Sequence, residues 1–331
     1  MNNANVIFER DWTEILKIVV CTKCKGTLTV LKDASDVTLY CASCSTYYPI
    51  RNDVIFMLKE NNRSFKIKGE WDNAAEGDHI KAAAAVSKEC VESPFVKLQP
   101  LPSEEVLRDK VHLDLGCGYG RTLIPCARHG TKISVGIDIS SVMLDRAVEL
   151  CNQEKVSCVL LNGDITDLPF EDSSFDIVYS SSVMLHLDKD STKRAIEEVK
   201  RILKPGGKVY FSGSFPNIFH LWRLPNLGIR LASLIKQQLE QHTRPYHLES
   251  RVRYYTYSQV IHLFRGFSEV NVFSFSYQLL PKNIGPFGVP FRSKVKSINT
   301  KFSKRIQLKK GNKWLRVLIP LSVHFDVEAT L

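Results

Sequence analysis

The alternation of apolar and polar positions divides the chain into two regions. Residues 27–31 and 37–40 alternate with a period of two, which predicts a short β-hairpin with its turn at 32–36. From residue 111 onward, short apolar runs alternate with longer helical patterns. Strands that alternate with helices build a parallel sheet. We therefore predict a doubly wound α/β sheet preceded by a small β domain.

The pattern also gives approximate domain boundaries. Helices are predicted after the first, second and fourth strands of the sheet, at 121–128, from about 141, and at 192–203, and a last helix leads into a final strand at 270–277. The small domain takes residues 1–62, and a linker with N-terminal helices takes 63–110. The sheet domain takes 111–280, with an insertion at 215–250 expected to form a lid, and 281–331 is a tail expected to pack on that lid. The predicted strands before the insertion are 111–115, 133–137, 156–161, 175–180 and 208–212.

Charge is concentrated at the C-terminal end. The 331 residues carry a net charge of +10, and residues 215–331 hold 18 Lys/Arg against 5 Asp/Glu. Within the tail, Phe291, Phe302 and Trp314 are interleaved with basic residues. Such a surface could bind RNA, a phosphorylated substrate or an anionic membrane, or it could be a solvated face whose aromatic residues pack inward.

The sequence disfavours a membrane-spanning protein and a secreted protein. No apolar run approaches the 18 or so residues of a membrane span, so we expect no transmembrane segment. The first 20 residues are interrupted by charge where a signal peptide would be apolar. We therefore expect a cytoplasmic protein, in which cysteines are free thiols or metal ligands more often than disulfides.

Four cysteines form a metal-binding pattern. Cys21 and Cys24 are one C-x2-C pair, Cys41 and Cys44 are another, and 16 residues separate the pairs. Two such turns on neighbouring hairpins can close a tetrahedral shell of four sulfurs around zinc, with no open position for catalysis. The alternatives are two disulfides or four unrelated thiols. We predict a structural zinc site.

The segment after the cysteines adds a resemblance. Tyr47–Ile55, YYPIRNDVI, resembles the YPIRDGIP signature of the Trm112-like zinc-ribbon family, although Asn52-Asp53 stands where Asp-Gly is usual. The resemblance covers roughly residues 10–60. Members of that family act as partners or fused modules of methyltransferases, several of which act on the translation apparatus.

The strand at 111–115 leads directly into a glycine turn. Gly116, Cys117, Gly118 and Gly120 lie between this strand and a helix, which predicts a nucleotide-type crevice. Asp138 ends the next strand, 24 residues after Asp114, where a carboxylate can accept the ribose hydroxyls. A nicotinamide dehydrogenase is the rival interpretation, but Arg121 occupies the place of the third glycine of GxGxxG.

Three further motifs follow: Asp164-Ile165 after the third strand, Ser180 at the end of the fourth, and LKPGGKVYFSG (203–213) leading into the fifth. With the glycine turn and Asp138, these five motifs in this order resemble the class I S-adenosylmethionine (SAM)-dependent methyltransferases of the type 11 branch, over about 105–280. The resemblance implies a Rossmann-like methyltransferase sheet with SAM as cofactor. It also implies that Asp114 and the glycine turn hold the methionine end of SAM and that Asp138 binds the ribose. The adenine contacts implied are Ile139, Met143, Asp164 and Ile165, and Ser180 would lie along the cofactor. Each aspartate alone could instead be an ordinary cap at the end of a strand.

A general base is the least defined part of the site. His186 follows the fourth strand and could deprotonate an acceptor hydroxyl, because an ordinary histidine titrates near neutral pH. It could equally fix its loop by hydrogen bonding.

Three functions follow from these patterns. The first is a SAM-dependent methyltransferase that acts on a small or carrier-borne acceptor enclosed by the insertion and tail. The second is a methyltransferase of RNA or a translation factor, in which the zinc ribbon and basic tail hold a macromolecule. The third is a non-catalytic SAM-binding module, which the intact glycine turn and three acidic positions disfavour.

Overall fold

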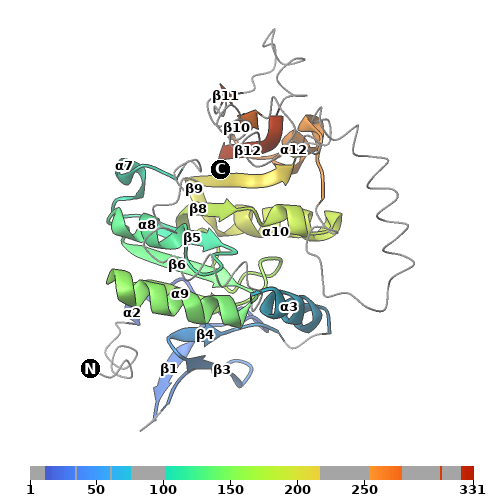
Figure 1. Ribbon diagram of the computed structural model, residues 1–331. Coiled ribbons are helices and arrows are strands. Elements are labelled where there is room, and N and C mark those ends of the chain that lie inside the picture. Colours follow the sequence, from blue (N-terminus) through green and yellow to red (C-terminus); the bar gives the residue numbers. More distant parts are fainter. Residues whose placement is uncertain are drawn as a thin grey trace, which may run out of the picture. The chain divides into compact units, whose positions relative to one another are not determined.

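The structure is a computed structural model, shown in Figure 1. It describes residues 12–33, 36–59, 62–75, 101–216, 253–277, 306–307 and 322–331. Most of the expected insertion and tail lies outside these residues. The chain forms two compact units, the first made of 1–181, 189–210 and 331, and the second of 182–188 and 211–330.

The first unit begins with a small antiparallel sheet. Its strands pair in the order β1-β2-β3-β4, and an exposed face alternates with a buried one, as in β2, where Val37, Leu39 and Cys41 are buried. The helix before it is α2, Thr13–Leu16. The strands are β1 Thr29–Lys32, β2 Val37–Cys41, β3 Thr46–Arg51 and β4 Val54–Phe56. The predicted hairpin is therefore present.

Strand β4 joins the small sheet to the large one. It pairs in parallel with β7, Val159–Asn162, placing Ile55 opposite Leu161. Val20 N–H donates to Pro169 O at 2.9 Å, and Glu171 N–H donates to Ile18 O at 2.9 Å. The N-terminal module, residues 12–59 as far as they are described, is thus hydrogen-bonded to the large sheet and to the segment at 169–171.

The large sheet of the first unit has the strand order β7-β6-β5-β8-β9. Within this sheet, β5 pairs in parallel with β6 and with β8, and β6 pairs in parallel with β7. The chain moves from β5 outward to β6 and β7, and then returns to place β8 on the other side of β5. This reversal creates a topological switch point at β5, where open α/β sheets bind ligands. The strands are β5 Val111–Leu115, β6 Ile133–Asp138, β8 Phe175–Ser181 and β9 Leu203–Pro216.

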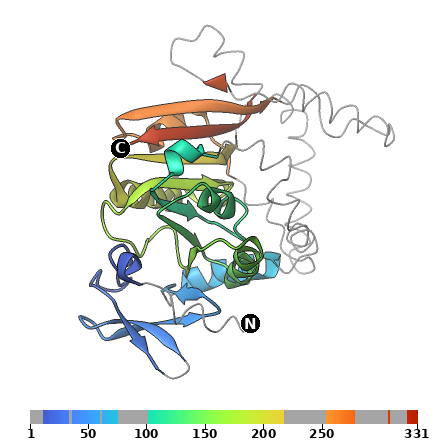
Figure 2. The same cartoon turned by 90° about the vertical axis from the view of Figure 1, so that its left-hand side faces the viewer.

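Helices connect and cover these strands. Apolar side chains of α8 and α9 pack with strand residues in one core cluster, and α3 lies beside α9 in both views (Figure 1, Figure 2). None of the described helices is long and apolar enough to cross a membrane. The helices of this unit's core are α3 Asn62–Ala75, α7 Glu104–Leu107, α8 Leu123–Arg128, α9 Ser141–Glu154 and α10 Lys189–Ile202.

The second unit contains the end of β9 and the C-terminal strands. A cluster of ring contacts joins Phe211 and Phe215 of β9 to Phe264, just after helix α12. The other elements are the 3-10 helix η1 Met184–His186, α12 Tyr257–Leu263, β10 Glu269–Tyr277, β11 Ile306–Gln307 and β12 Ser322–Thr330.

Two features differ from the sequence expectations. The sheet does not end near residue 280, because β12 of the tail pairs antiparallel with β10 along eight residue pairs. The turn expected at 204–207 is part of strand β9, which begins at Leu203 directly after α10. Gly206 and Gly207 exchange backbone hydrogen bonds with Leu331 at 3.1 and 3.0 Å. A chain terminus that contacts a distant segment explains both differences.

Candidate functional site: a nucleotide-type crevice beside a cysteine quartet

The glycine turn leaves β5 and folds over the end of β6. Gly116 and Cys117 N–H groups donate to Ile137 O at 2.8 and 3.1 Å. Gly118 has a φ of 53°, and a Cβ added there would meet nothing within 4 Å. Gly120 has a φ of 86° and lies against Ile124. The turn therefore needs glycine for its left-handed backbone, and its Gly118 side is open to a ligand.

Asp138 fixes the turn from the neighbouring strand. One carboxylate oxygen accepts from Gly118 N–H at 2.8 Å, and the other accepts from Ser140 N–H at 2.9 Å. Burial raises the pKa of Asp138, although the backbone hydrogen bonds oppose the shift. The carboxylate sits at the carboxyl end of β6, as predicted for a ribose acceptor.

Asp114 is fully buried one strand away. It accepts a hydrogen bond from the Thr122 hydroxyl at the start of α8. The pKa of Asp114 is raised to about 7, mainly by burial; the Thr122 hydrogen bond opposes this shift and the nearby Asp138 adds to it. A carboxyl group that is balanced between its charged and neutral forms can respond to a cationic ligand group.

The loop after β7 meets Asp138 as well. Asn162 donates through its side chain to Ile139 O at 2.8 Å, and Gly163 N–H donates to Asp138 O at 3.0 Å. Asp164 then closes a tight turn by accepting from the Thr166 N–H and hydroxyl, both at 2.8 Å. The three acidic positions thus lie at, or just after, the carboxyl ends of three adjacent parallel strands.

The remaining predicted contacts have mixed environments. Ile165 and Met143 are buried, whereas Ile139 is partly exposed. Ser180 is fully buried and its hydroxyl donates to Leu115 O at 2.9 Å, which ties β8 to β5. Cys117 is buried in the apolar cluster beneath the turn, and burial raises the pKa of its thiol.

His186 belongs to the second unit. It ends the 3-10 helix η1, where its backbone N–H donates to Val183 O at 3.0 Å. Burial lowers the pKa of His186 to about 4. The imidazole is therefore neutral at neutral pH, the form that can accept a proton.

The four predicted cysteines converge in the N-terminal module. Their sulfurs all lie within 4.8 Å of one another, with Cys21 to Cys44 and Cys24 to Cys41 both at 3.5 Å. Zinc–sulfur bonds of about 2.3 Å in a tetrahedron separate sulfurs by about 3.8 Å. The described cysteines are free thiols. The donor set and its geometry fit a tetrahedral zinc ion.

Several polar residues of the site were not predicted. Asp72 of α3 accepts from the Ser140 hydroxyl at 2.7 Å, beside Asp138 at the start of α9. Thr122 and Asn162 hold Asp114 and Ile139, as described above. Asp72 lies 68 residues from its partner, and no local pattern in the sequence marks such a contact. Asn162 did have a signal, since it directly follows an apolar strand beside Asp164.

Fold and site together define a Rossmann-like α/β protein with a glycine turn at the switch point of its sheet and an attached cysteine-rich module. Comparison with protein families narrows this class. Residues 113–211 match the family described as methyltransferase domain, and residues 13–53 match the Trm112p-like proteins. The chain thus combines a methyltransferase domain with a Trm112p-like region.

Individual relatives match over part of their length. A protein of Encephalitozoon cuniculi, provisionally described as a methyltransferase, is 39% identical over 104 residues, which are 31% of this chain and 44% of the relative. The sterol 4-C-methyltransferase of Caenorhabditis elegans is 35% identical over 108 residues, 31% of this chain and 30% of the relative. The ubiquinone biosynthesis O-methyltransferase of Coxiella burnetii is 31% identical over 117 residues, 35% and 49% of the two chains. The chain spans less than half the length of each.

The chain also has similar solved structures. A SAM-dependent methyltransferase from Thermotoga maritima is 15% identical, with a TM-score of 0.46 over 80% of this chain and 99% of that one. A similarity at that level adds nothing to what the strand order shows.

Proposed function

We propose that this protein is a SAM-dependent methyltransferase whose acceptor is a small or carrier-borne molecule. The observation that carries the proposal is the junction of the glycine turn with Asp138, in which Gly118 N–H donates to the carboxylate at 2.8 Å beneath an open left-handed turn. In this proposal the glycine turn and Asp114 hold the methionine end of SAM. Asp138 binds the ribose hydroxyls, and the adenine lies between Ile139–Met143 and Asp164–Ile165.

The chemistry asks little of the protein beyond positioning. The methyl group of a sulfonium is already activated, so alignment of the acceptor with the methyl carbon supplies most of the rate. His186 is the candidate base if the acceptor must lose a proton, because it follows the fourth strand. Burial lowers the pKa of His186 to about 4, so the neutral imidazole is a weaker base than an ordinary histidine.

The acceptor class is supported by the relatives. Those of C. elegans and C. burnetii are named for sterol and ubiquinone methylation, and one from Actinopolyspora halophila for glycine, sarcosine and dimethylglycine. These names cover carbon, oxygen and nitrogen acceptors, so the acceptor atom is not carried over.

A second candidate is a methyltransferase of RNA or a translation factor, which the Trm112p-like region and the basic C-terminal third favour. Methyl transfer from labelled SAM into fractionated cell extract separates the two candidates. Label in the small-molecule fraction supports the first. Label in RNA or protein, with binding that weakens steeply as salt rises, supports the second.

The cysteine quartet completes the proposal as a structural zinc site. Four thiolates leave no open coordination position, so the ion would stabilise the module and take no part in methyl transfer.

Calorimetry with S-adenosylhomocysteine, the product of SAM, tests the cofactor assignment. We expect the wild type to bind it and Asp138→Ala to bind it at least tenfold more weakly, because the ribose hydroxyls lose a charged acceptor. Glu105→Ala, which removes an exposed carboxylate of α7, is the control and should bind like the wild type. Equal affinity of Asp138→Ala and wild type would disprove the ribose assignment.

A further inference from the structure

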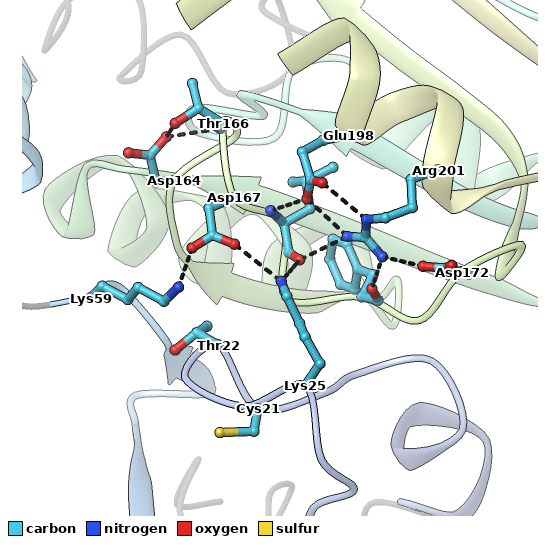
Figure 3. Close-up of polar contacts among 12 residues, drawn as sticks. Cys21, Thr22, Lys25, Lys59, Asp164, Thr166, Asp167, Asp172, Glu198 and Arg201 are labelled. Atoms are coloured by element: carbon cyan, nitrogen blue, oxygen red, sulfur yellow. Dashed lines mark hydrogen bonds and ion pairs between the residues drawn. The ribbon is translucent and has the colours of Figure 1, made fainter. Parts of the chain in front are cut away.

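We propose that Lys25 and Lys59 are positioning residues for the cofactor: they hold the turn at 164–168 in its binding conformation and so couple metal binding at the cysteine quartet to SAM affinity. The inference rests on the proposed placement of adenine against Asp164 and Ile165. Its evidence lies in the contacts between the N-terminal module and this turn (Figure 3).

The N-terminal module contacts this turn mainly through Asp167. Lys25 Nζ donates to one carboxylate oxygen at 3.0 Å and also to Leu168 O at 3.1 Å, while Lys59 Nζ donates to the other carboxylate oxygen. Burial alone would raise the pKa of Asp167, but Lys59 and Lys25 outweigh it and lower the pKa. The carboxylate is therefore ionised and bound on both sides.

A hydrogen-bonded turn of the backbone connects Asp167 to Asp164 and Ile165, the predicted adenine contacts. Asp167 N–H donates to Asp164 O at 3.1 Å, and the Asp164 carboxylate accepts from Thr166. Residues 164–167 thus form one hydrogen-bonded turn, and Asp167 is its last residue. A shift of Asp167 moves the backbone that carries Asp164 and Ile165.

Helix α10 holds the same turn from the opposite side. Leu168 N–H donates to Glu198 at 2.7 Å, and Arg201 donates to Leu168 O at 3.1 Å and to Phe170 O at 2.7 Å. These contacts would persist without the lysines. We therefore expect loss of the lysine contacts to loosen the turn and weaken the cofactor, not to abolish binding.

The position of Lys25 depends on the cysteine loop. Its backbone N–H donates to Cys21 O at 2.9 Å, its φ is 58°, and it directly follows Cys24 of the quartet. A left-handed backbone at a non-glycine residue persists only when its surroundings hold it. A metal that joins Cys21 and Cys24 would fix this loop and aim the lysine at Asp167.

The lysine contacts themselves are partly exposed, with 44% and 43% of the Lys25 and Lys59 side chains accessible. Exposed ion pairs contribute little to folding stability. The conformation of the turn, and not the melting temperature, is therefore the quantity that the lysines should change.

The test is calorimetry with S-adenosylhomocysteine on the full chain. For Lys25→Met combined with Lys59→Met, we expect affinity to fall about threefold to tenfold, in the range that two exposed ion pairs can shift an equilibrium. Lys25→Arg should restore most of the loss attributable to Lys25. Lys23→Met is the matched control, an exposed lysine of the same loop for which the described residues show no ion pair, and should match the wild type.

Metal removal tests whether the lysines carry the coupling between the cysteine quartet and the cofactor. Zinc depletion with a chelator should weaken binding of S-adenosylhomocysteine in the wild type, should weaken it clearly less in the double lysine variant, and should be reversed by zinc. Hydrogen exchange at residues 166–168 should rise with depletion of the wild type. The inference is overturned if the double variant binds within twofold of the wild type, or if depletion has the same effect on both proteins. Failure of the zinc-loaded wild type to bind S-adenosylhomocysteine would instead refute the proposed cofactor site itself.

Discussion

Strand β5 places two ionisable side chains, His112 and Asp114, on the same side of a fully buried strand. Burial lowers the pKa of His112 to about 3 and raises the pKa of Asp114 to about 7. Both shifts favour the neutral form. The two shifts change the pH dependence of folding stability in opposite directions, because one group is a base and the other an acid. Stability rises with pH where His112 titrates and falls with pH where Asp114 titrates.

Asp114 gives a prediction on pH dependence. Its folded pKa lies above its unfolded value, so the folded state holds the extra proton between about pH 4 and pH 7, and stability falls as pH rises through that window. Asp114→Asn removes this loss. The free energy of unfolding of the variant, relative to that of the wild type, should therefore rise by about 1–3 kcal/mol from pH 5 to pH 8. Thermal unfolding at both pH values measures the difference. Glu105→Gln, an exposed carboxylate on α7, should show no such trend, and a gain for Asp114→Asn that is independent of pH would contradict the assignment.

Residues that end a predicted strand were the ones the sequence could identify. Asp114 and Asp138 follow from the apolar runs that precede them, because parallel strands place their carboxyl ends together. Asp72 and Asp167 could not be found in this way, since each acts on partners about 70 or more residues away, Ser140 and Lys25 among them. Distant contacts of this kind depend on packing, which a single sequence does not encode locally.

At the scale of elements, the edge of the large sheet is extended by β4. Ile55 is fully buried on this strand and lies opposite Leu161 of β7. Ile55→Ala should therefore cost about 2–4 kcal/mol of folding free energy, the range for removing a buried aliphatic side chain. Denaturant unfolding measures it, and a single transition is expected because β4 is hydrogen-bonded to both sheets. Leu31→Ala, at an exposed position on β1, should change stability by less than about 0.5 kcal/mol; a separate early transition in Ile55→Ala would show that the module folds on its own.

The type of each element was easier to predict than its partner. Four strands of the large sheet, β5 to β8, match the apolar runs to within a few residues. The pairing of β4 with β7 was not predicted, because a period of two marks a strand but does not say which edge it joins. Strand β12 has the same alternating pattern, with Phe325, Val327 and Ala329 buried. Its residues lie within the tail at 281–331, where the many basic residues are a stronger sequence signal than this short alternation.

At the scale of the molecule, the small module and the methyltransferase sheet act as one hydrogen-bonded unit. Their junction combines a parallel strand pair, the two backbone hydrogen bonds of Val20 and Glu171, and the lysine contacts with Asp167. A small β module has a thin core, so its stability should depend on the metal. Loss of the metal should then be felt beyond the module.

Metal depletion tests this dependence. We expect about one zinc per chain and a lower melting temperature after depletion, with near-ultraviolet circular dichroism of the large unit changing in the same transition, because the module's edge strand belongs to that sheet. Cys41→Ser should reproduce the depleted behaviour, since a shell of four sulfurs loses a ligand. Cys158→Ala, at a buried thiol of the core cluster, should keep its zinc and lose only the small stability of a packing residue. A zinc-free protein with the melting temperature of the loaded one would show that the quartet has no structural role, and two independent transitions would show that the junction does not transmit it.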